Sequence, residues 1–598
     1  MIAYNAEIPG IVARHAALGR SIHAADIYSA MTIADLKDGI HPADAGYSKM
    51  ATVWFNKLIE IGFSPDSNRP TVSLTEPATD ATFAAPANIT MHAAALDADG
   101  TVTKVEFFQG TAKLGEDLEA PYSFTWSGVP PGTYSLTAKA VDNDGLTSSS
   151  TTVTVNVSTT STSGVGAWSP VLQWPTEAVH MSILPDGKVL VVNRSGGARE
   201  WDPVTNTFTL VPHPTTNTFC AGHSFLPDGR LLVAGGHVTT RVGVNDASIY
   251  DYRTKSWTPV APMNDARWYP TNTSLPNGEV LVVSGSIDQT MLNMLPQVWQ
   301  TGGGWRDLTG AVLSMPTSSA IYPWMFVAPD GRVFNPGPDQ VTRFLDTSGS
   351  GSWSTGPTTN NTNFGARSNG TAVMYEPGKI LIAGGGFPAT NSAEVIDLNE
   401  PSPVWRNVSA MNKSRAHANS TILPDGKVLV TGGGYDNPDT WVYEAELWNP
   451  VSETWSVLPR MEVQRWYHST AVLLPDGRVV TAGSDNVSNA QIYSPQYLFS
   501  GPRPTITSAP DEVTFGQTFL IDTPDAENIA GVTLIRLPSV THSFNMNTRF
   551  NRLSFSRSAG GLEVTAPGHA NLSPPGHYML FVLNGSGVPS VAKIIRIN

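Results

Sequence analysis

A turn followed by an apolar strand recurs seven times in this 598-residue chain and constrains its fold more than any other feature. Most copies read Leu-Pro, Asp or Asn, Gly and then a run of apolar residues, as in LPDGRLLVAGG. The copies begin at residues 184, 226, 275, 328, 376, 423 and 474, so their spacing is 42 to 53 residues. A repeat of this length is typical of the blades of a β-propeller. We therefore predict a seven-bladed propeller over residues 165–500.

Tryptophan and glycine mark the same repeats. Several copies are followed by a strand that carries a tryptophan, as in REWDP, KSWTP, PVWRN and ETWSV, and several of the apolar strands end in Gly-Gly. Glycine pairs and spaced aromatic residues resemble kelch repeats. A kelch propeller by itself predicts binding rather than catalysis. The residues on the innermost strand of each blade must therefore indicate the function.

The repeats are flanked by two further regions of alternating strands. Segments such as TVSLTEP, NITMHAAAL and VTKVEFFQG in residues 68–157 predict an antiparallel sandwich that resembles bacterial Ig-like modules. STTSTSGVG (158–166) has the composition of a flexible linker. Residues 501–598 alternate in the same way without a linker, so we expect a second Ig-like sandwich packed on the propeller. The predicted fold class is mostly β, with a short α/β remnant at the N-terminus.

Residues 1–64 differ from the rest of the chain. Their second half has the apolar spacing of a helix. The stretch DGIHPADAGYSKMA resembles the C-terminal block of SGNH (GDSL-type) esterases, whose Asp and His would here be Asp38 and His41. The Gly-Asp-Ser nucleophile block is missing, and a base without a nucleophile performs no acyl transfer. We expect a partial hydrolase tail with a vestigial, inactive dyad.

Charge and hydropathy exclude several classes of partner. The net charge is −14, and no Lys/Arg cluster offsets it, which argues against nucleic acid and anionic membranes. No apolar run approaches the roughly 18 residues that a membrane-spanning helix needs. The first residues lack the basic and apolar regions of a signal peptide. Cys220 is the single cysteine, so a structural intrachain disulfide is impossible.

Alignment of the seven copies on the turn proline brings chemically active residues together. The position seven residues before that proline is expected to line the central channel. It holds Cys220, Tyr269, His417 and His468, with Ala178, Tyr322 and Gly370 in the other three copies. Equivalent positions of a closed ring converge on its axis. The Arg-x-Tyr/His pattern recurs with the repeat, and we expect Arg267, Arg415 and Arg465 to stabilise the blades by hydrogen bonds.

Tyrosine and histidine together are ligands suited to copper or iron. Tyr467 directly precedes His468, and neighbouring strand residues face opposite sides, so binding one metal requires a twist or a bulge there. The stretch RLPSVTHSFNMNTRF offers a further donor, His542. His223, His237 and His417 are expected to be channel-lining or surface residues with a structural role rather than ligands.

These motifs resemble the copper radical oxidases, the family of galactose oxidase, glyoxal oxidase and their bacterial relatives. The resemblance covers residues 165–598. FCAGHSFLPDGRLLVAGG carries the family cysteine as Cys220, and ARWYPTNTSLPNGEVLVVSG the cross-linked tyrosine as Tyr269. RWYHSTAVLLPDGRVVTAGSDN carries the axial tyrosine and first histidine as Tyr467 and His468, and THSFNMNTRF the second histidine as His542. The ending PPGHYMLFVLNGSGVPSVAKIIRI is also similar.

The resemblance implies one copper ion, held by Tyr269, Tyr467, His468 and His542. It also implies a thioether between Cys220 and Tyr269, which copper and oxygen form unaided and which stabilises a radical on the phenol. Tyr467 would take the substrate's hydroxyl proton, and the Tyr269 radical a hydrogen atom from carbon. O2 would then be reduced to hydrogen peroxide. The implied enzyme is a secreted monomer that acts on small alcohols, aldehydes or carbohydrates.

One departure concerns the tryptophan that stacks over the thioether in galactose oxidase. In this chain Ile287 stands at the expected spacing, and Trp268, Trp174 and Trp324 are candidates to cover the radical instead. RWYPT and IYPWMFVAPDGRVF resemble glyoxal oxidase more than galactose oxidase, which favours small aldehydes or simple primary alcohols as substrates. The alternative from another class is a non-catalytic kelch propeller that binds carbohydrate or mediates adhesion. It predicts no copper and a free Cys220 thiol.

Overall fold

The fold is described from a computed structural model of the chain. The described residues are 13–14, 32, 34, 44–60, 69–79, 81–84, 87–130, 132–158, 165–212, 216–313, 320–360, 366–435, 438–558 and 560–598. Asp38 and His41 lie outside them. The chain divides into two compact units, residues 1–158 and 159–598.

The first unit contains helix α2 (Asp44–Glu60), which confirms the helical spacing of this segment, and two β-sheets. One sheet has the strand order β1 (Thr71–Glu76), β3 (Ala87–Leu96), β6 (Tyr122–Val129). The other has the order β2 (Ala81–Ala84), β9 (Val153–Ser158), β7 (Gly132–Asp142), β4 (Val102–Gln109), β5 (Ala112–Asp117), with β8 (Thr147–Ser149) also paired to β7. Alternate residues of β3, including Ile89 and Met91, pack with Phe107 and Leu136 of the other sheet in one core. No helix in the described part of the chain is long and apolar enough to cross a membrane.

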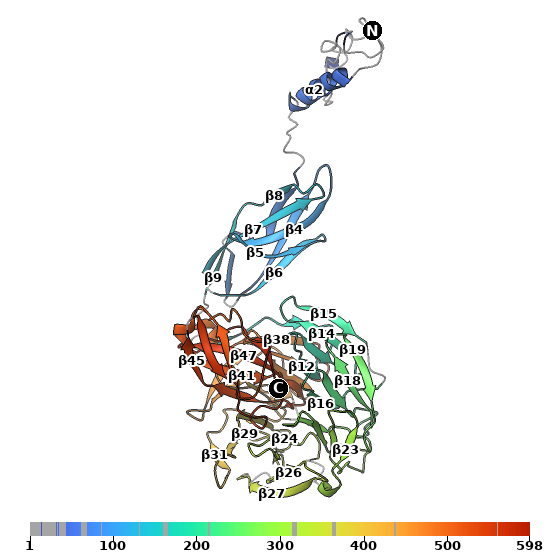
Figure 1. The fold of residues 1–598 in the computed structure, drawn as a ribbon, viewed down its shortest axis with the longest axis vertical. Helices are drawn as coiled ribbons and strands as arrows, with labels where there is room; N and C mark the ends of the chain where they lie inside the picture. Colours follow the sequence, from blue (N-terminus) through green and yellow to red (C-terminus); the bar gives the residue numbers. More distant parts are fainter. Residues whose placement is uncertain are drawn as a thin grey trace. The chain divides into compact units, whose positions relative to one another are not determined.

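The second unit contains, among the described residues 165–500, seven antiparallel sheets of at least four strands each (Figure 1). In chain order their strands are β12 (His180–Ile183), β13 (Val189–Val192), β14 (Ala198–Asp202), β15 (Thr207–Val211); β16 (Gly222–Phe225), β17 (Leu231–Ala234), β18 (Ala247–Asp251), β19 (Ser256–Val260); β20 (Thr271–Ser274), β21 (Val280–Val283), β22 (Gln297–Trp299), β23 (Trp305–Asp307); β24 (Trp324–Val327), β25 (Val333–Gly337), β26 (Val341–Asp346), β27 (Ser352–Thr358); β28 (Thr371–Glu376), β29 (Lys379–Ala383), β30 (Ala393–Asp397), β31 (Arg406–Val408); β32 (Asn419–Ile422), β33 (Val428–Thr431), β34 (Glu444–Asn449), β35 (Thr454–Arg460); and β36 (Ser469–Leu473), β37 (Val479–Gly483), β38 (Asn489–Ser494).

The recurring turn joins the first two strands of each sheet. In the second sheet Asp228 Oδ1 accepts the backbone N–H of Arg230 at 3.1 Å, and Gly229 has φ +86°, a conformation that favours glycine. The same pair of features recurs in the last sheet at Asp476 and Gly477. The apolar residues that follow the turn are then fully buried, as in β17. This local chemistry explains why the motif recurs at one place in every sheet.

The seventh sheet is completed by strands from the other end of the repeat region. β10 (Ala167–Trp168) and β11 (Leu172–Gln173) both pair antiparallel with β38. Residues near 170 and 490 are thus hydrogen-bonded within one sheet.

The C-terminal region forms two more sheets and a hairpin. The sheets have the orders β39 (Glu512–Val513), β48 (Lys593–Ile597), β47 (Gly576–Asn584), β41 (Ile529–Arg536), β44 (Phe550–Leu553) and β40 (Thr518–Asp522), β46 (Gly561–Thr565), β45 (Phe555–Ser558). The hairpin strands β42 (Ser539–Thr541) and β43 (Phe544–Asn545) extend the first sheet, because β42 pairs with β12. The C-terminal region therefore reaches the innermost strands. Short 3-10 turns are η4 (Thr309–Ala311), η5 (Pro438–Thr440), η6 (Gln496–Phe499) and η7 (Ala526–Asn528).

The repeated arginines are buried and bind the backbone, as predicted. Arg267, Arg415 and Arg465 are at most 1% exposed. Their Nη1 groups donate to the carbonyls of Ser284, Gly432 and Gly483, each at the end of a second strand. A fourth arginine, missed in the sequence, makes the same bond: Arg367 donates to Gly384.

Loss of a buried arginine should destabilise this unit strongly. Arg415 Nη2 lies 2.6 Å from the Glu446 carboxylate, and neither side chain is exposed. Arg415→Met leaves that carboxylate without its cation, so we expect the free energy of unfolding to fall by about 3–5 kcal/mol. The matched control is Arg406→Met, because the Arg406–Glu453 pair is largely exposed and worth at most about 1 kcal/mol. Urea unfolding of both variants measures the difference; equal losses would contradict it.

Candidate metal centre

Five side chains at equivalent positions of the repeat share one unusual backbone conformation. Cys220, Tyr269, Tyr322, His417 and His468 occupy the equivalent position of five repeats and have φ between 48° and 67°. Left-handed φ is uncommon outside glycine. Each residue lies one or two positions before an innermost strand. Backbone hydrogen bonds connect some of them: the Tyr269 N–H donates to the Cys220 carbonyl at 2.9 Å, and the Tyr322 N–H to the Tyr269 carbonyl at 2.8 Å.

The sequence analysis required a twist or a bulge between Tyr467 and His468, and this conformation, rather than a bulge, reorients the backbone there. Strands β36 and β37 pair from Ser469 to Leu473 without a register shift. His468 instead has φ 64° and lies just before the strand. The two rings consequently lie on the same side, with centroids 3.8 Å apart.

The predicted donor atoms do converge. The Tyr269 and Tyr467 hydroxyls are hydrogen-bonded to each other, and Tyr269 Oη lies 3.4 Å from His468 Nε2. The ring of His542 lies 4.5 Å from that of Tyr269 and 4.6 Å from that of His468. His542 follows β42, so the hairpin of the C-terminal region places it here. Two phenols and two imidazoles thus meet, although the first and last of these residues are 273 positions apart in the sequence.

His542 has a buried nitrogen without a hydrogen-bond partner, its Nε2. Its Nδ1 contacts Thr541 Oγ1 at 2.6 Å, and that hydroxyl donates to the Val179 carbonyl. Because the Thr541 hydroxyl donates its hydrogen bond to Val179, it accepts one from the N–H at Nδ1 of His542. Nε2 then carries no hydrogen and keeps a free lone pair. A buried unpaired nitrogen is costly unless something occupies it. The donor set and this nitrogen fit a bound metal ion.

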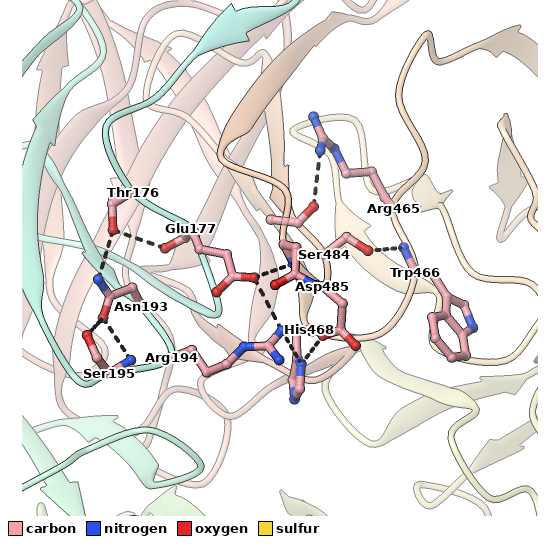
Figure 2. A network of polar contacts seen from close by, with 12 residues as sticks. Thr176, Glu177, Asn193, Arg194, Ser195, Arg465, Trp466, His468, Ser484 and Asp485 are labelled. Atoms are coloured by element: carbon pink, nitrogen blue, oxygen red, sulfur yellow. Dashed lines mark hydrogen bonds and ion pairs between the residues drawn. The ribbon is translucent and has the colours of Figure 1, made fainter. Parts of the chain in front are cut away.

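His468 is oriented in a similar way by Asp485 (Figure 2). Its Nδ1 lies 2.5 Å from Asp485 Oδ1, which leaves Nε2 free to face Tyr269. Arg194 Nη2 also contacts Asp485 Oδ1, and it reaches Glu177 at 3.3 Å. A carboxylate behind a ligating histidine fixes its tautomer. Both imidazoles therefore present Nε2.

The sequence analysis missed Asp485, Arg194 and Glu177. Asp485 lies two residues after Gly483, the carbonyl partner of Arg465, and the third copy of the repeat has Ser286 at the equivalent position. The repeat register therefore does not identify it. Arg194 and Glu177 belong to the first sheet, and nothing in their spacing relates them to His468.

Burial sets the charge state of the centre. It raises the pKa of the Tyr269 and Tyr467 phenols and lowers the pKa of His542 well below 6.5. Without a cation the phenols are protonated and His542 is neutral. Among the described residues no three His, Cys, Asp or Glu side chains come together to hold a metal. The phenols are therefore needed to complete a donor set.

Cys220 is fully buried beside Tyr269. Burial raises the pKa of its thiol well above the ordinary value, and side-chain contacts with Tyr269 and Trp268 lower it in part. His223, His237 and His417 lie around the centre. His223 and His180 form a buried pair at 2.9 Å, and the His417 ring packs 4.9 Å from that of Tyr467.

Two aromatic rings stack on Tyr269. Trp268 lies 3.7 Å away at 11°, and Tyr322 lies 4.5 Å away at 24°. Two rings at these separations cannot share one face of a phenol, so Tyr269 lies between them. Trp174 packs on Trp201 instead. Of the candidates proposed to replace the tryptophan absent at Ile287, Trp268 is the one that covers Tyr269.

Two family models match the repeat region and the C-terminal region of the second unit. The glyoxal oxidase N-terminus model matches residues 197–340 and 371–500, and the galactose oxidase-like early set domain matches 503–597. A bacterial Ig domain model matches residues 70–138 of the first unit. The models therefore cover most of the repeat region from residue 197 on, the C-terminal region and part of the N-terminal sandwich.

Comparisons with individual proteins agree with the family models. A galactose oxidase of Gibberella zeae is 31% identical over 491 residues, which cover 73% of this chain and 71% of that protein. An aldehyde oxidase of Vitis pseudoreticulata is 28% identical over 456 residues, covering 64% and 82%. A solved fungal alcohol oxidase in complex with copper superposes with a TM-score of 0.67 at 25% identity, over 73% of this chain and 100% of that one.

These relatives identify the chain as an oxidase. The chain belongs to the copper radical oxidase family, with galactose oxidase among its relatives.

Asp485 should control copper affinity through His468. In Asp485→Asn the Nδ1 proton loses its charged acceptor, so we expect copper affinity to fall about 10- to 100-fold. Glu177→Gln is the matched control: it removes a carboxylate of the same network that does not contact His468. Competition titration with a copper chelator measures both variants. The role of Asp485 is wrong if the two variants bind copper equally well.

Proposed function

We propose that this chain oxidises primary alcohols or small aldehydes with O2, giving the aldehyde or acid and hydrogen peroxide. The observation that carries this proposal is the meeting of Tyr269, Tyr467, His468 and His542 around one point, with the single cysteine against Tyr269. A binding module needs no such set. The relatives named above are a galactose oxidase, an aldehyde oxidase and an alcohol oxidase, which support this range of substrates.

The unpaired Nε2 of His542 and the free Nε2 of His468, with the two phenol oxygens, would hold one copper ion. When bound, copper supplies a one-electron redox partner and a Lewis acid for the substrate oxygen. Because burial raises the pKa of both phenols, they release their protons only toward a cation or a base. The protein therefore provides a neutral, dry site.

Tyr467 and Tyr269 would divide the chemistry between them. Tyr467 Oη accepts the hydroxyl proton of the substrate, and the oxidised Tyr269 accepts a hydrogen atom from the substrate carbon. The remaining electron would pass to the bound copper, so that the substrate has lost two electrons and two protons. O2 accepts the same number and becomes hydrogen peroxide. The hydrogen bond between the two hydroxyls keeps both groups within reach of one substrate.

Cys220 and Tyr269 would form the thioether of the mature enzyme. The sulfur replaces a hydrogen on the phenol ring, and two hydrogen atoms leave with O2 as their acceptor. The contact between the thiol and Tyr269 and the burial of both side chains support this step. An electron-rich sulfur on the ring makes the phenol easier to oxidise.

The architecture is part of the proposal. We infer that the seven sheets are the blades of a kelch-type propeller at 165–500, and that residues 68–157 and 501–598 are Ig-like sandwiches, the second of which supplies His542. The closure of the seventh sheet by β10 and β11 supports a ring. We also infer a secreted monomer, because copper and oxygen chemistry suits an exported enzyme.

Maturation can be tested by mass. After copper loading under air, the chain should become lighter by two hydrogen atoms, and the peptides containing Cys220 and Tyr269 should be joined. Cys220→Ser should keep its mass, because it has no thiol to couple. Intact-mass spectrometry and peptide mapping measure both. A folded, copper-loaded wild type with a free Cys220 thiol would favour the non-catalytic binding module.

The role of Tyr467 can be separated from maturation. Tyr467→Phe removes the proton acceptor but leaves Cys220 and Tyr269 in place. We expect the joined peptide to form, while peroxide production from primary alcohols falls at least about 100-fold. A peroxidase-coupled assay with small alcohols and aldehydes measures turnover. A variant that keeps wild-type turnover would exclude Tyr467 as the base.

A further inference from the structure

Trp268 makes a polar contact that the proposed chemistry does not use. While its ring stacks on Tyr269, its indole Nε1–H donates to Nδ1 of His237 at 3.0 Å. Trp268 is only 7% exposed, and a buried indole N–H needs an acceptor. Five other tryptophans donate to a backbone carbonyl or an asparagine. The imidazole acceptor is therefore a particular feature of the ring over Tyr269.

His237 is held in place by its own surroundings. It follows β17, and its backbone N–H donates to the Asn217 carbonyl at 3.0 Å. Its ring packs 5.0 Å from that of Phe219, which in turn lies 5.3 Å from His468. Burial lowers the pKa of His237, which favours the neutral ring, and its Nδ1 can accept the hydrogen bond from the indole N–H. The acceptor is fixed independently of Trp268.

An acceptor on the indole N–H has two physical consequences. It fixes the plane of Trp268, because rotation of the ring would break the bond. It also raises the electron density of the indole, which helps a stacked neighbour to carry a radical. Both effects act on the one ring that lies flat against Tyr269 at 11°.

We propose that His237 is a positioning residue for the Tyr269 radical: its Nδ1 holds Trp268 parallel to Tyr269 and makes oxidation of Tyr269 more favourable. This rests on the proposed radical function. In the oxidation concerned, one electron leaves the deprotonated Tyr269 and no proton moves. In the test, an added one-electron oxidant, hexachloroiridate(IV), accepts that electron.

The experiment compares His237→Phe, His237→Asn and Trp268→Phe with the wild type. Phenylalanine keeps a ring beside Phe219 but removes the acceptor, whereas the asparagine oxygen replaces Nδ1. In the copper-free protein, the indole N–H resonance of Trp268 is assigned by its loss in Trp268→Phe. We expect it to shift in His237→Phe and to return toward its wild-type position in His237→Asn.

The second measurement is the yield of the Tyr269 radical in the copper-loaded, matured protein at a fixed hexachloroiridate ratio. Because His237→Phe removes one hydrogen bond, we expect its ratio of oxidised to reduced Tyr269 to be about threefold lower than in the wild type. In His237→Asn the ratio should recover. In a Trp268→Phe background, His237→Phe should have no further effect. Thermal unfolding of each copper-free variant shows whether it is folded.

The outcomes separate the two proposals. Three results would overturn the role of His237 and leave the proposed function standing. They are an unchanged indole resonance in His237→Phe, an unchanged radical yield in His237→Phe, and an equal loss of radical yield when His237→Phe is added to Trp268→Phe. Absence of any radical in the matured wild type would overturn the proposed function and this role with it.

Discussion

A left-handed residue at the entrance of five innermost strands is the constraint on which the centre depends. A non-glycine residue in this conformation costs about 1 kcal/mol or more and persists only where its neighbours enforce it. Hydrogen bonds between equivalent residues of successive repeats enforce it at Tyr269 and Tyr322. The consequence is that side chains beside the strands, rather than within them, converge on the candidate metal centre. Two residues adjacent in sequence can then face the same point, as the rings of Tyr467 and His468 do.

The sheets around this centre are held by interactions that recur with the repeat. Each Asp-Gly turn satisfies its own backbone, and each buried arginine binds a carbonyl at the end of a second strand. In the seventh sheet Asp485, which contacts His468, comes two residues after Gly483, the carbonyl partner of Arg465. The end of one second strand thus serves both a buried arginine and the candidate metal centre.

Much of this arrangement could be predicted from sequence, because the repeat makes equivalent positions visible. The aligned copies identified Cys220, Tyr269 and His468, and the buried arginines followed from the same pattern. The geometry at Tyr467 could not be predicted, since the alternation rule assumes an ordinary strand and His468 is left-handed. Arg194 and Glu177 were missed because they approach from another sheet. Trp268 could not be chosen over Trp174 and Trp324, because stacking depends on ring orientation and not on spacing.

The pairing of β42 with β12 gives the centre an unusual dependence on chain order. His542 reaches the axis only after the C-terminal hairpin has joined a sheet whose first strand was made about 360 residues earlier. A chain that ends before this hairpin lacks His542, the last residue of the proposed donor set. Under the proposed function, metal capture would therefore report that the C-terminal region has been made and has docked. The oxidative chemistry would then be confined to the finished chain.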